Sequence, residues 1–297
     1  MGEGGTETGK PGGRWPADAA GAGSSILPAL VRHRAGPRGD AAVSALSRAH
    51  WGRWRGYLSD AIELILPRAC VSCERMLSRL EMGIVCGLCW SRLPLLPSPQ
   101  CSRCGHPLSG GKCRWCELLP PFVRAARSVC WMPGEPGSSI VHALKYGAWE
   151  SVADELAERM SRLVWPRDVV EERAGLVPIP LASARKRQRG YNQSALIARG
   201  LGIRWRIPVW EDVVERSRET TSQTRLTPDQ RLDNVAGSFR IVPKAAGRIR
   251  GAHVVIVDDV VTTAATLNTC ATLLYKTGAR IISYVTFGRA RASGDRL

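Results

Sequence analysis

VVIVDDVVTTAAT, residues 254–266, is the stretch that decides the fold we expect for the second half of this chain. Residues 254–257 are an unbroken run of aliphatic, β-branched side chains, typical of a strand buried on both faces of a parallel sheet. Asp258 and Asp259 follow at the carboxyl end of that strand, which is the edge where open α/β sheets bind ligands. A helical pattern over 264–276 completes a predicted strand–loop–helix unit with polar side chains at the sheet edge.

The loop in this unit has the composition of a phosphate site. Thr262, Thr263 and Thr266 supply hydroxyls beside a helix N-terminus, whose free amides and dipole attract anions. A pair of carboxylates next to such a loop suits a phosphorylated sugar. The sequence therefore predicts that Asp258 and Asp259 bind the ribose hydroxyls and that the loop binds the 5′-phosphate.

Three other interpretations of this motif stay open. An aliphatic strand that ends in acids is typical of a Walker B element, although the chain has no G-x-x-x-x-G-K-[ST] loop upstream. A phospho-acceptor aspartate on a flavodoxin-like sheet would account for an acid but not for the threonines. A buried strand with surface acids at its end is the plainest alternative, and the adjacent acids and threonines count against it.

Composition divides the chain and limits its partners. The 297 residues carry a net charge of +16, which favours anionic partners such as nucleic acid or phosphorylated metabolites. Without a signal peptide or an apolar run of about 18 residues, we expect a cytoplasmic protein with no membrane insertion. The expected parts are a disordered extension (1–50), a helix (51–66), a Cys-rich module (67–120) and an α/β domain (125–292).

Eight of the ten cysteines lie in the Cys-rich module as four C-x-x-C pairs. This spacing lets both thiolates of a pair reach one metal at a tight turn, and four thiolates complete a tetrahedral zinc shell. The module has few large apolar residues, so we expect two structural Zn²⁺ ions to hold it together as a double zinc ribbon. The predicted ligands are Cys70, Cys73, Cys86, Cys89, Cys101, Cys104, Cys113 and Cys116.

The cysteine pattern leaves some questions open. The spacing is compatible with both sequential and interleaved pairing of the C-x-x-C units. A redox role for one pair and disulfide bonds are the weaker alternatives, because the pairs are many and the expected compartment is reducing. Cys130 and Cys270 stand alone and are expected in the core, and His106 is expected to be a bystander rather than a ligand.

The middle of the chain is strongly basic. Between 185 and 250 there are fifteen Lys or Arg residues against six Asp or Glu residues. We expect four of them on a loop that faces the same sheet edge as the acidic pair, where they would meet a pyrophosphate group. These four are Arg185, Lys186, Arg187 and Arg189. Lys145, on a short helix, is a further candidate anion contact. A last group comprises Arg216, Arg218, Gln223 and Arg231. They are expected to form a mobile lid or a second anion contact, and a solvated basic face is the plain alternative.

Periodicity predicts the elements of the α/β domain. Strands are expected near 127–132, 175–179, 237–242, 253–258 and 281–287. Helices are expected near 138–146, 149–164, 192–201 and 264–276. This alternation favours a mostly parallel sheet with helices on both faces.

The motif at 254–266 resembles the phosphoribosyl-pyrophosphate (PRPP) binding motif of type I phosphoribosyltransferases. With four C-x-x-C pairs ahead of it, the chain resembles the ComF family, the competence-protein ComFC and GntX-like group. Three more segments are similar to that family: VPIPLASARKRQRGYNQSALIARGL at 177–201, RSRETTSQTRLTPDQRLDNVAGSF at 216–239 and ALKYG at 143–147.

The resemblance implies a type I phosphoribosyltransferase-like domain that binds PRPP with Mg²⁺ and transfers phosphoribosyl to an acceptor that the sequence does not identify. It implies Asp258 and Asp259 as the catalytic acidic pair. The implied 5′-phosphate loop consists of Thr262, Thr263, Ala264, Ala265 and Thr266, with Ala264 where the motif usually has glycine. The family also implies a link to DNA uptake, with single-stranded DNA or DNA-uptake proteins as partners. A non-catalytic PRPP sensor or a DNA- or protein-binding adaptor is the alternative function.

Overall fold

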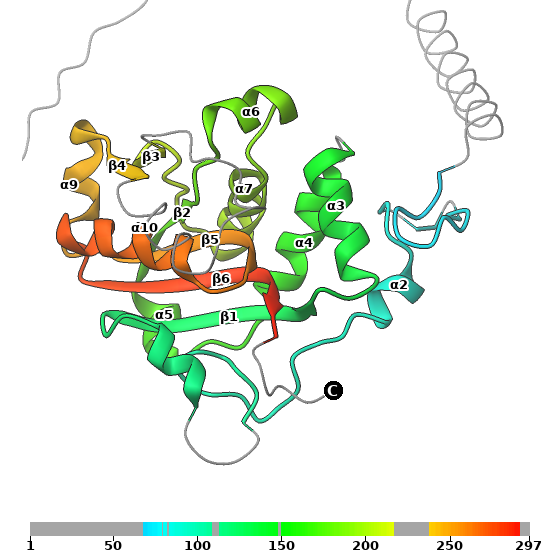
Figure 1. Cartoon of the computed structure of the whole chain (residues 1–297), viewed down its shortest axis with the longest axis horizontal. Helices are drawn as coiled ribbons and strands as arrows, with labels where there is room; N and C mark the ends of the chain where they lie inside the picture. The colour runs from blue at the N-terminus through cyan, green and yellow to red at the C-terminus, as the bar shows by residue number, and fades with distance from the viewer. Residues whose placement is uncertain are drawn as a thin grey trace, which may run out of the picture. The chain divides into compact units, whose positions relative to one another are not determined.

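The computed structural model describes residues 68–78, 80–81, 83–108, 113–147, 150–216 and 238–291 (Figure 1). The disordered extension expected at 1–50 and the helix expected at 51–66 lie outside these residues. Within the described ranges, no helix is long and apolar enough to span a bilayer.

Four parallel strands form the central sheet. They are β1 (Val123–Met132), β2 (Arg173–Pro178), β5 (His253–Val261) and β6 (Ile281–Ala290), in the spatial order β1-β6-β5-β2. The strand that opens the phosphate-loop motif, β5, is therefore interior, and its residues 254–257 are fully buried. Four of the five predicted strands are thus confirmed as members of this sheet, with the acidic pair at the carboxyl end of β5.

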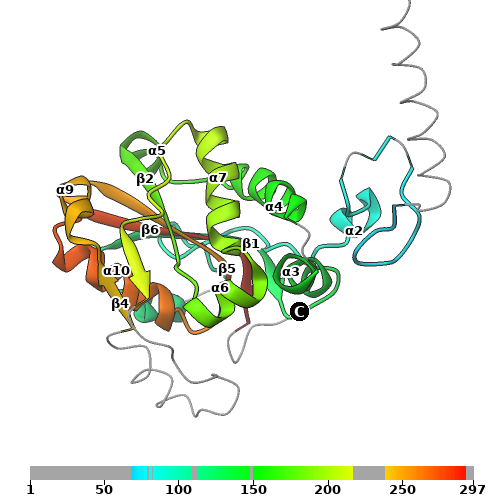
Figure 2. The same cartoon turned by 90° about the horizontal axis from the view of Figure 1, so that it is seen from above.

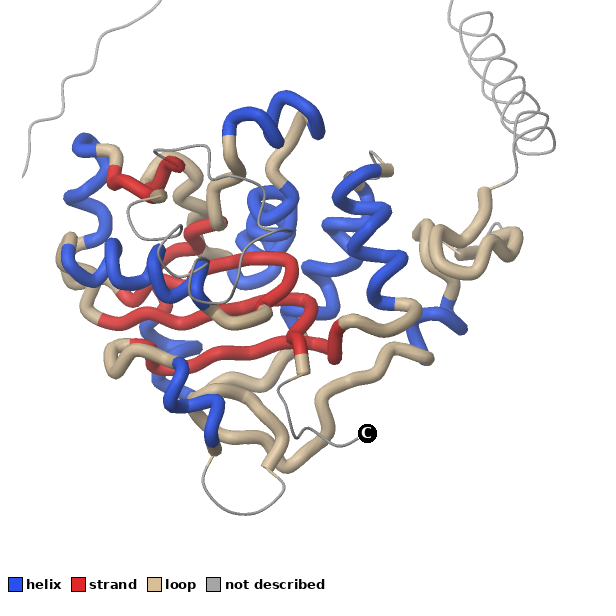
Figure 3. Tube along the Cα trace, viewed as in Figure 1, coloured by secondary structure: helices blue, strands red, loops and turns tan. Residues whose placement is uncertain are grey.

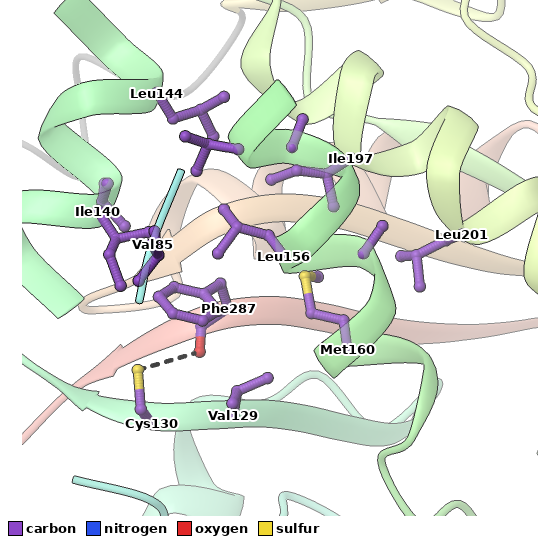
Figure 4. Close-up of a cluster of buried hydrophobic side chains, with 14 of the residues drawn as sticks. Val85, Val129, Cys130, Ile140, Leu144, Leu156, Met160, Ile197, Leu201 and Phe287 are labelled. Atoms are coloured by element: carbon purple, nitrogen blue, oxygen red, sulfur yellow. Dashed lines mark hydrogen bonds between the residues drawn. The ribbon is translucent and has the colours of Figure 1, made fainter. Parts of the chain in front are cut away.

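Alternate residues of β5 enter two separate hydrophobic clusters, one on each face of the sheet. On one face, Val255 and Val257 pack with α3 (Gly137–Tyr146), α4 (Ser151–Ser161) and α7 (Gln193–Trp205). Figure 4 shows Leu144, Leu156, Met160 and Ile197 of these helices gathered around Phe287 of β6.

The opposite face of β5 is covered by a different set of helices. Val254 and Ile256 pack there with α10 (Ala265–Lys276) and with Ile249 of α9 (Ala246–Ile249). Figure 2, seen from above, places α7 and α10 on opposite sides of the sheet. The predicted α/β architecture with helices on both faces is confirmed, and Figure 3 shows the strands enclosed by helices.

Two local predictions need correction. The strand expected at 237–242 is confirmed as β4 (Phe239–Ile241), but it pairs antiparallel with the three-residue β3 (Val214–Arg216) and does not join the parallel sheet. The basic loop expected after β2 is a helix, α6 (Ser183–Arg189), which ends at Gly190 with a φ of 82°. Its residues SARKRQR are mostly good helix formers, and glycine adopts the left-handed conformation that closes such a helix.

The Cys-rich module consists of two similar knuckles. In the first, the amide of Cys70 donates to Arg75 O at 2.8 Å, and in the second the amide of Cys101 donates to His106 O at 2.8 Å. The second cysteine pair of each unit lies at a short helix: Cys86 and Cys113 stand at the N-cap positions of α2 (Gly87–Ser91) and η1 (Arg114–Leu118), which contain Cys89 and Cys116. We call these units the first ribbon (68–93) and the second ribbon (99–119).

Candidate functional site: a phosphate loop, an acidic pair and two four-cysteine centres

A cavity of about 630 Å³ lies at the carboxyl ends of the parallel strands. Its walls include four segments that the sequence singled out: α3, α6, the end of β5 and the loop before α10. The ends of β1 and β2, the start of α7 and the end of β3 also line it. Of the predicted site residues, the structure brings together Lys145, Arg185, Arg189, Asp258, Asp259, Thr262 and Thr266. Those that do not line the cavity are Lys186, Arg187, Thr263, Ala264 and Ala265.

The acidic pair has two different environments. Asp258 Oδ1 accepts hydrogen bonds from Ser194 Oγ at 2.8 Å and from the amide of Asp259 at 3.0 Å. Burial and the neighbouring charge of Asp259 raise the pKa of Asp258 to about 8. Asp259 is 5% exposed and forms an ion pair with Lys145 Nζ. The two carboxylates therefore differ: burial disfavours the charged form of Asp258, whereas a cation neutralises Asp259.

Ser194 is a site residue that sequence reasoning missed. It lies at the start of α7, where Asn192 caps the helix by accepting from the amide of Ser194 at 3.2 Å. Gln193 and Ser194 are 6% and 1% exposed. Polar residues in the first turn of a helix that begins at the ligand-binding edge of the sheet could have indicated Ser194 from the sequence. The adjacent Tyr191 is anchored too, since its hydroxyl donates to Leu144 O at 2.5 Å.

The phosphate loop turns sharply into α10. Thr262 and Thr263 are exposed, and Ala264 is buried at the N-cap position with φ 58° and ψ 2°. This is the left-handed region, where a non-glycine residue costs about 1 kcal/mol. The glycine usual in this motif therefore matches a real backbone requirement, and this chain meets it with alanine. The first amides of α10 have no partner within the helix and are suited to an anion.

Basic side chains face the acidic pair across the cavity. Arg185 and Arg189 of α6 line the wall, and the Arg189 guanidinium lies 4.8 Å from the centre of the Tyr146 ring. Arg216, at the end of β3, also lines the cavity, and burial together with the charge of Arg185 lowers its pKa. Arg218, Gln223 and Arg231 lie outside the described residues.

The eight module cysteines form two separate clusters. One contains Cys70, Cys73, Cys86 and Cys89, and the other contains Cys101, Cys104, Cys113 and Cys116. The pairing is therefore sequential along the chain. Sγ atoms within each cluster lie within 4.8 Å of one another, with Cys101–Cys116 at 3.4 Å and Cys73–Cys86 at 3.7 Å.

These clusters fit zinc. A tetrahedral site with Zn–S bonds of about 2.3 Å has S–S edges of about 3.8 Å, close to the distances found. All ten cysteines are free thiols, and Cys130 and Cys270 are fully buried core residues, as expected. His106 belongs to neither cluster and stacks on Trp115 with ring centres 6.0 Å apart, which confirms the bystander role.

Comparison with known proteins agrees with this architecture. A phosphoribosyl transferase domain model matches residues 182–296, and a double zinc ribbon domain model matches residues 61–119. The DNA utilization protein YhgH of Escherichia coli (strain K12) is 33% identical over 232 residues, covering 74% of this chain and 96% of that protein.

Two competence proteins are also similar. Competence protein F of Haemophilus influenzae is 36% identical over 118 residues, covering 39% of this chain and 50% of that protein. Competence protein ComFC of Bacillus subtilis (strain 168) is 26% identical over 201 residues, covering 65% of this chain and 79% of that protein. The fold and the two cysteine clusters define a double-zinc-ribbon protein with a phosphoribosyltransferase domain. Within that class, the chain belongs to the ComF family.

Proposed function

We propose that this protein binds PRPP with Mg²⁺ and transfers the phosphoribosyl group to an acceptor. One observation supports this most: a single cavity joins the acidic pair, the threonine loop and a basic helix. In this proposal Asp258 and Asp259 bind the ribose hydroxyls. The 5′-phosphate lies against the loop of Thr262, Thr263, Ala264, Ala265 and Thr266. Among the bases of α6, Arg185 and Arg189 contact the pyrophosphate, and Lys186 and Arg187 contribute long-range charge only.

The chemistry needs charge stabilisation more than a protein nucleophile. The C1–O bond to pyrophosphate breaks, the electron pair leaves with pyrophosphate, and positive charge develops on the ribose. Arginine side chains stabilise the leaving group, and the acidic pair holds the ribose in position as the acceptor attacks C1. Mg²⁺ bound with PRPP would supply further positive charge to the pyrophosphate. Lys145 neutralises Asp259 before PRPP binds and then turns to the pyrophosphate, because the ribose takes its place.

We further propose that the activity serves the handling of DNA in the cytoplasm. The relatives are named for DNA utilization and for competence. Single-stranded DNA or a DNA-uptake protein is the partner class that their names and the net charge of +16 suggest. A non-catalytic PRPP-sensing or DNA-binding adaptor is the second candidate function. The alanine at the left-handed position of the phosphate loop favours it, because strain there weakens phosphate binding.

Calorimetric titration of Mg²⁺-PRPP into the full chain tests the first proposal. The parent should bind, and the Asp258→Asn/Asp259→Asn double variant should not. Arg185→Gln should weaken binding, whereas Lys186→Gln, its exposed neighbour on α6, should change it little. Binding without pyrophosphate release in the presence of candidate acceptors would favour the sensor. No binding by a folded, zinc-loaded parent would contradict the proposal.

A further inference from the structure

Two buried arginines lie against the second ribbon. Arg127 and Arg289 are 7% and 1% exposed, on β1 and β6. Arg127 Nη2 donates to Ser102 O at 2.9 Å, and Arg289 Nη2 donates to Cys104 O at 2.6 Å. Neither forms a salt bridge to a carboxylate among the described residues. Two cations are thus buried beside one four-cysteine centre without an acidic partner from that part of the chain.

Such burial needs a compensating negative charge. An unpaired buried cation is strongly destabilising, so buried charges are normally paired or located beside a metal centre. Four cysteine thiolates around Zn²⁺ carry a net charge of about −2, which two arginines would neutralise. The zinc–thiolate centre is therefore the counter-charge available to these side chains.

Arg289 retains hydrogen-bond donors that its contact with Cys104 O does not use. Within the described residues, its Nε and Nη1 atoms are buried and have no hydrogen-bond partner. Its guanidinium lies 4.6 Å from the centre of the Trp115 ring, and Trp115 stands between the ligands Cys113 and Cys116. A guanidinium in this place supplies N–H groups and positive charge to a thiolate centre, which is how residues around a metal's ligands stabilise it.

The same arginine lies directly beside the phosphate loop. In the parallel register of β5 and β6, Arg289 is the partner of Val261, the last strand residue before that loop. Trp115 and Arg289 also share a small internal cavity with Ala264 and Leu267 of the loop and α10. A second link is polar, since Asn268 Nδ2 of α10 donates to Leu118 O of the second ribbon at 2.7 Å.

We propose that Arg289 is a positioning residue that joins the second zinc–thiolate centre to the phosphate loop, so that loss of this zinc loosens the loop. The first ribbon differs, as far as its described residues show. The cation beside its thiolates is Arg75, whose side chain is 49% exposed and already paired with Glu81 at 2.6 Å. The coupling itself does not depend on PRPP. Only its consequence for activity rests on the function proposed above.

The test compares Arg289→Met, Arg289→Lys and the matched first-ribbon variant Arg75→Met in the full chain. Zinc release to a chelator is followed together with mass mapping of cysteine alkylation, which tells the two centres apart. In Arg289→Met the second centre should release zinc about 10- to 100-fold faster. Amide exchange over 262–268 should rise in the same variant. Arg289→Lys should restore part of both effects, and Arg75→Met should change neither.

Two further measurements keep the test decisive if Arg289→Met does not fold. Graded chelation of the parent chain should raise loop exchange in step with alkylation of the second cluster, not of the first. Asn268→Ala should raise loop exchange while zinc content stays unchanged. Unaltered zinc release in Arg289→Met, or loop exchange that follows loss of the first zinc, would overturn the proposal. A failure to bind PRPP would leave these outcomes intact and would count against the proposed activity alone.

Discussion

The two ribbons have the same ligand set and the same knuckle, yet they contact the domain in different ways. The first ribbon packs on the face of the sheet that α3 and α4 cover, where Val85 and Leu93 belong to their hydrophobic cluster. Arg159 of α4 lies 3.8 Å from the centre of the Trp90 ring. Glu155 of α4 accepts from the amide of Ile84 at 2.9 Å and from Trp90 Nε1 at 3.0 Å. The second ribbon enters the core below the phosphate loop through Trp115 and two buried arginines. The same four-cysteine ligand set can therefore have different structural roles, because different residues of the domain pack against each ribbon.

Loss of the second zinc site should have the largest effect. Cys104→Ser removes a ligand and leaves Arg127 and Arg289 without their counter-charge. We expect a loss of about 3–5 kcal/mol in domain stability, the usual cost of an orphaned buried charge. Cys86→Ser is the control in the first ribbon and should lower zinc content with a smaller effect on the α/β domain. Calorimetric unfolding with zinc analysis measures both, and equal destabilisation by the two variants would contradict the comparison.

The residue that follows the first cysteine pair of each ribbon provides a second comparison between the two ribbons. Glu74 and Gly105 occupy equivalent positions with φ of 59° and 67°. A Cβ on Gly105 would lie 2.5 Å from Ala126 O of β1, so glycine is needed there for space as well as for conformation. Gly105→Ala should cost about 1–3 kcal/mol through overpacking and strain. Glu74→Gly should be neutral or slightly stabilising, and a comparable loss in both variants by urea unfolding would show that the knuckles are equivalent.

The first ribbon can be loosened without affecting the second. Glu155→Ala removes both acceptors that hold Ile84 and Trp90, at a cost of about 1–3 kcal/mol for the donors left unpaired. Limited proteolysis should then cut near the first ribbon faster, while exchange at the phosphate loop stays as in the parent. Glu158→Ala, on the exposed side of α4 where it pairs with Arg162, is the matched control and should alter neither.

A pH series separates the acidic pair from both ribbons. The pKa of Asp258 in the folded chain, about 8, lies above its ordinary value, so the folded state binds this proton more tightly. The stability that comes from it is present below the ordinary pKa and is lost as pH rises through about 8. Asp258→Asn should therefore gain melting temperature relative to the parent between about pH 5 and pH 8. A constant difference across that range would mean that Asp258 is not protonated in the folded chain.

The smallest expected effect concerns the loop that the second ribbon supports. Ala264→Gly removes the cost of a left-handed alanine and should stabilise the chain by less than about 1 kcal/mol, because glycine also gains freedom when unfolded. PRPP affinity should hold or improve. Weaker binding in titration calorimetry would show that the loop depends on the alanine methyl group.

Local sequence patterns predicted the elements that form from one continuous segment of the chain. The unbroken aliphatic run identified β5 as an interior strand, and the threonine loop and α10 follow within one short segment. The four C-x-x-C pairs predicted two four-cysteine clusters, but which pairs combine depends on the fold. β3 has three residues, too few for a periodic pattern, so the sequence did not predict that β3 and β4 form an antiparallel pair.

The missed residues share a physical reason. Ser194 bonds to Asp258 across 64 positions, and Arg289 bonds to Cys104 across 185. Glu155 lies 71 positions from Ile84. Each is an ordinary polar residue in its own segment, and its role arises only when distant segments meet. The sequence therefore predicted the threonine loop and the cysteines of the two clusters, while the residues that position them required the tertiary structure.

The most direct test of the central claim is a crystal structure of the zinc-loaded full chain with Mg²⁺-PRPP. We predict the 5′-phosphate on the loop 262–266, the ribose hydroxyls on Asp258 and Asp259, and the pyrophosphate near Arg185 and Lys145. Density for PRPP elsewhere, or an empty cavity at saturating ligand in crystals that leave the site open, would contradict the assignment of this cavity as the PRPP site.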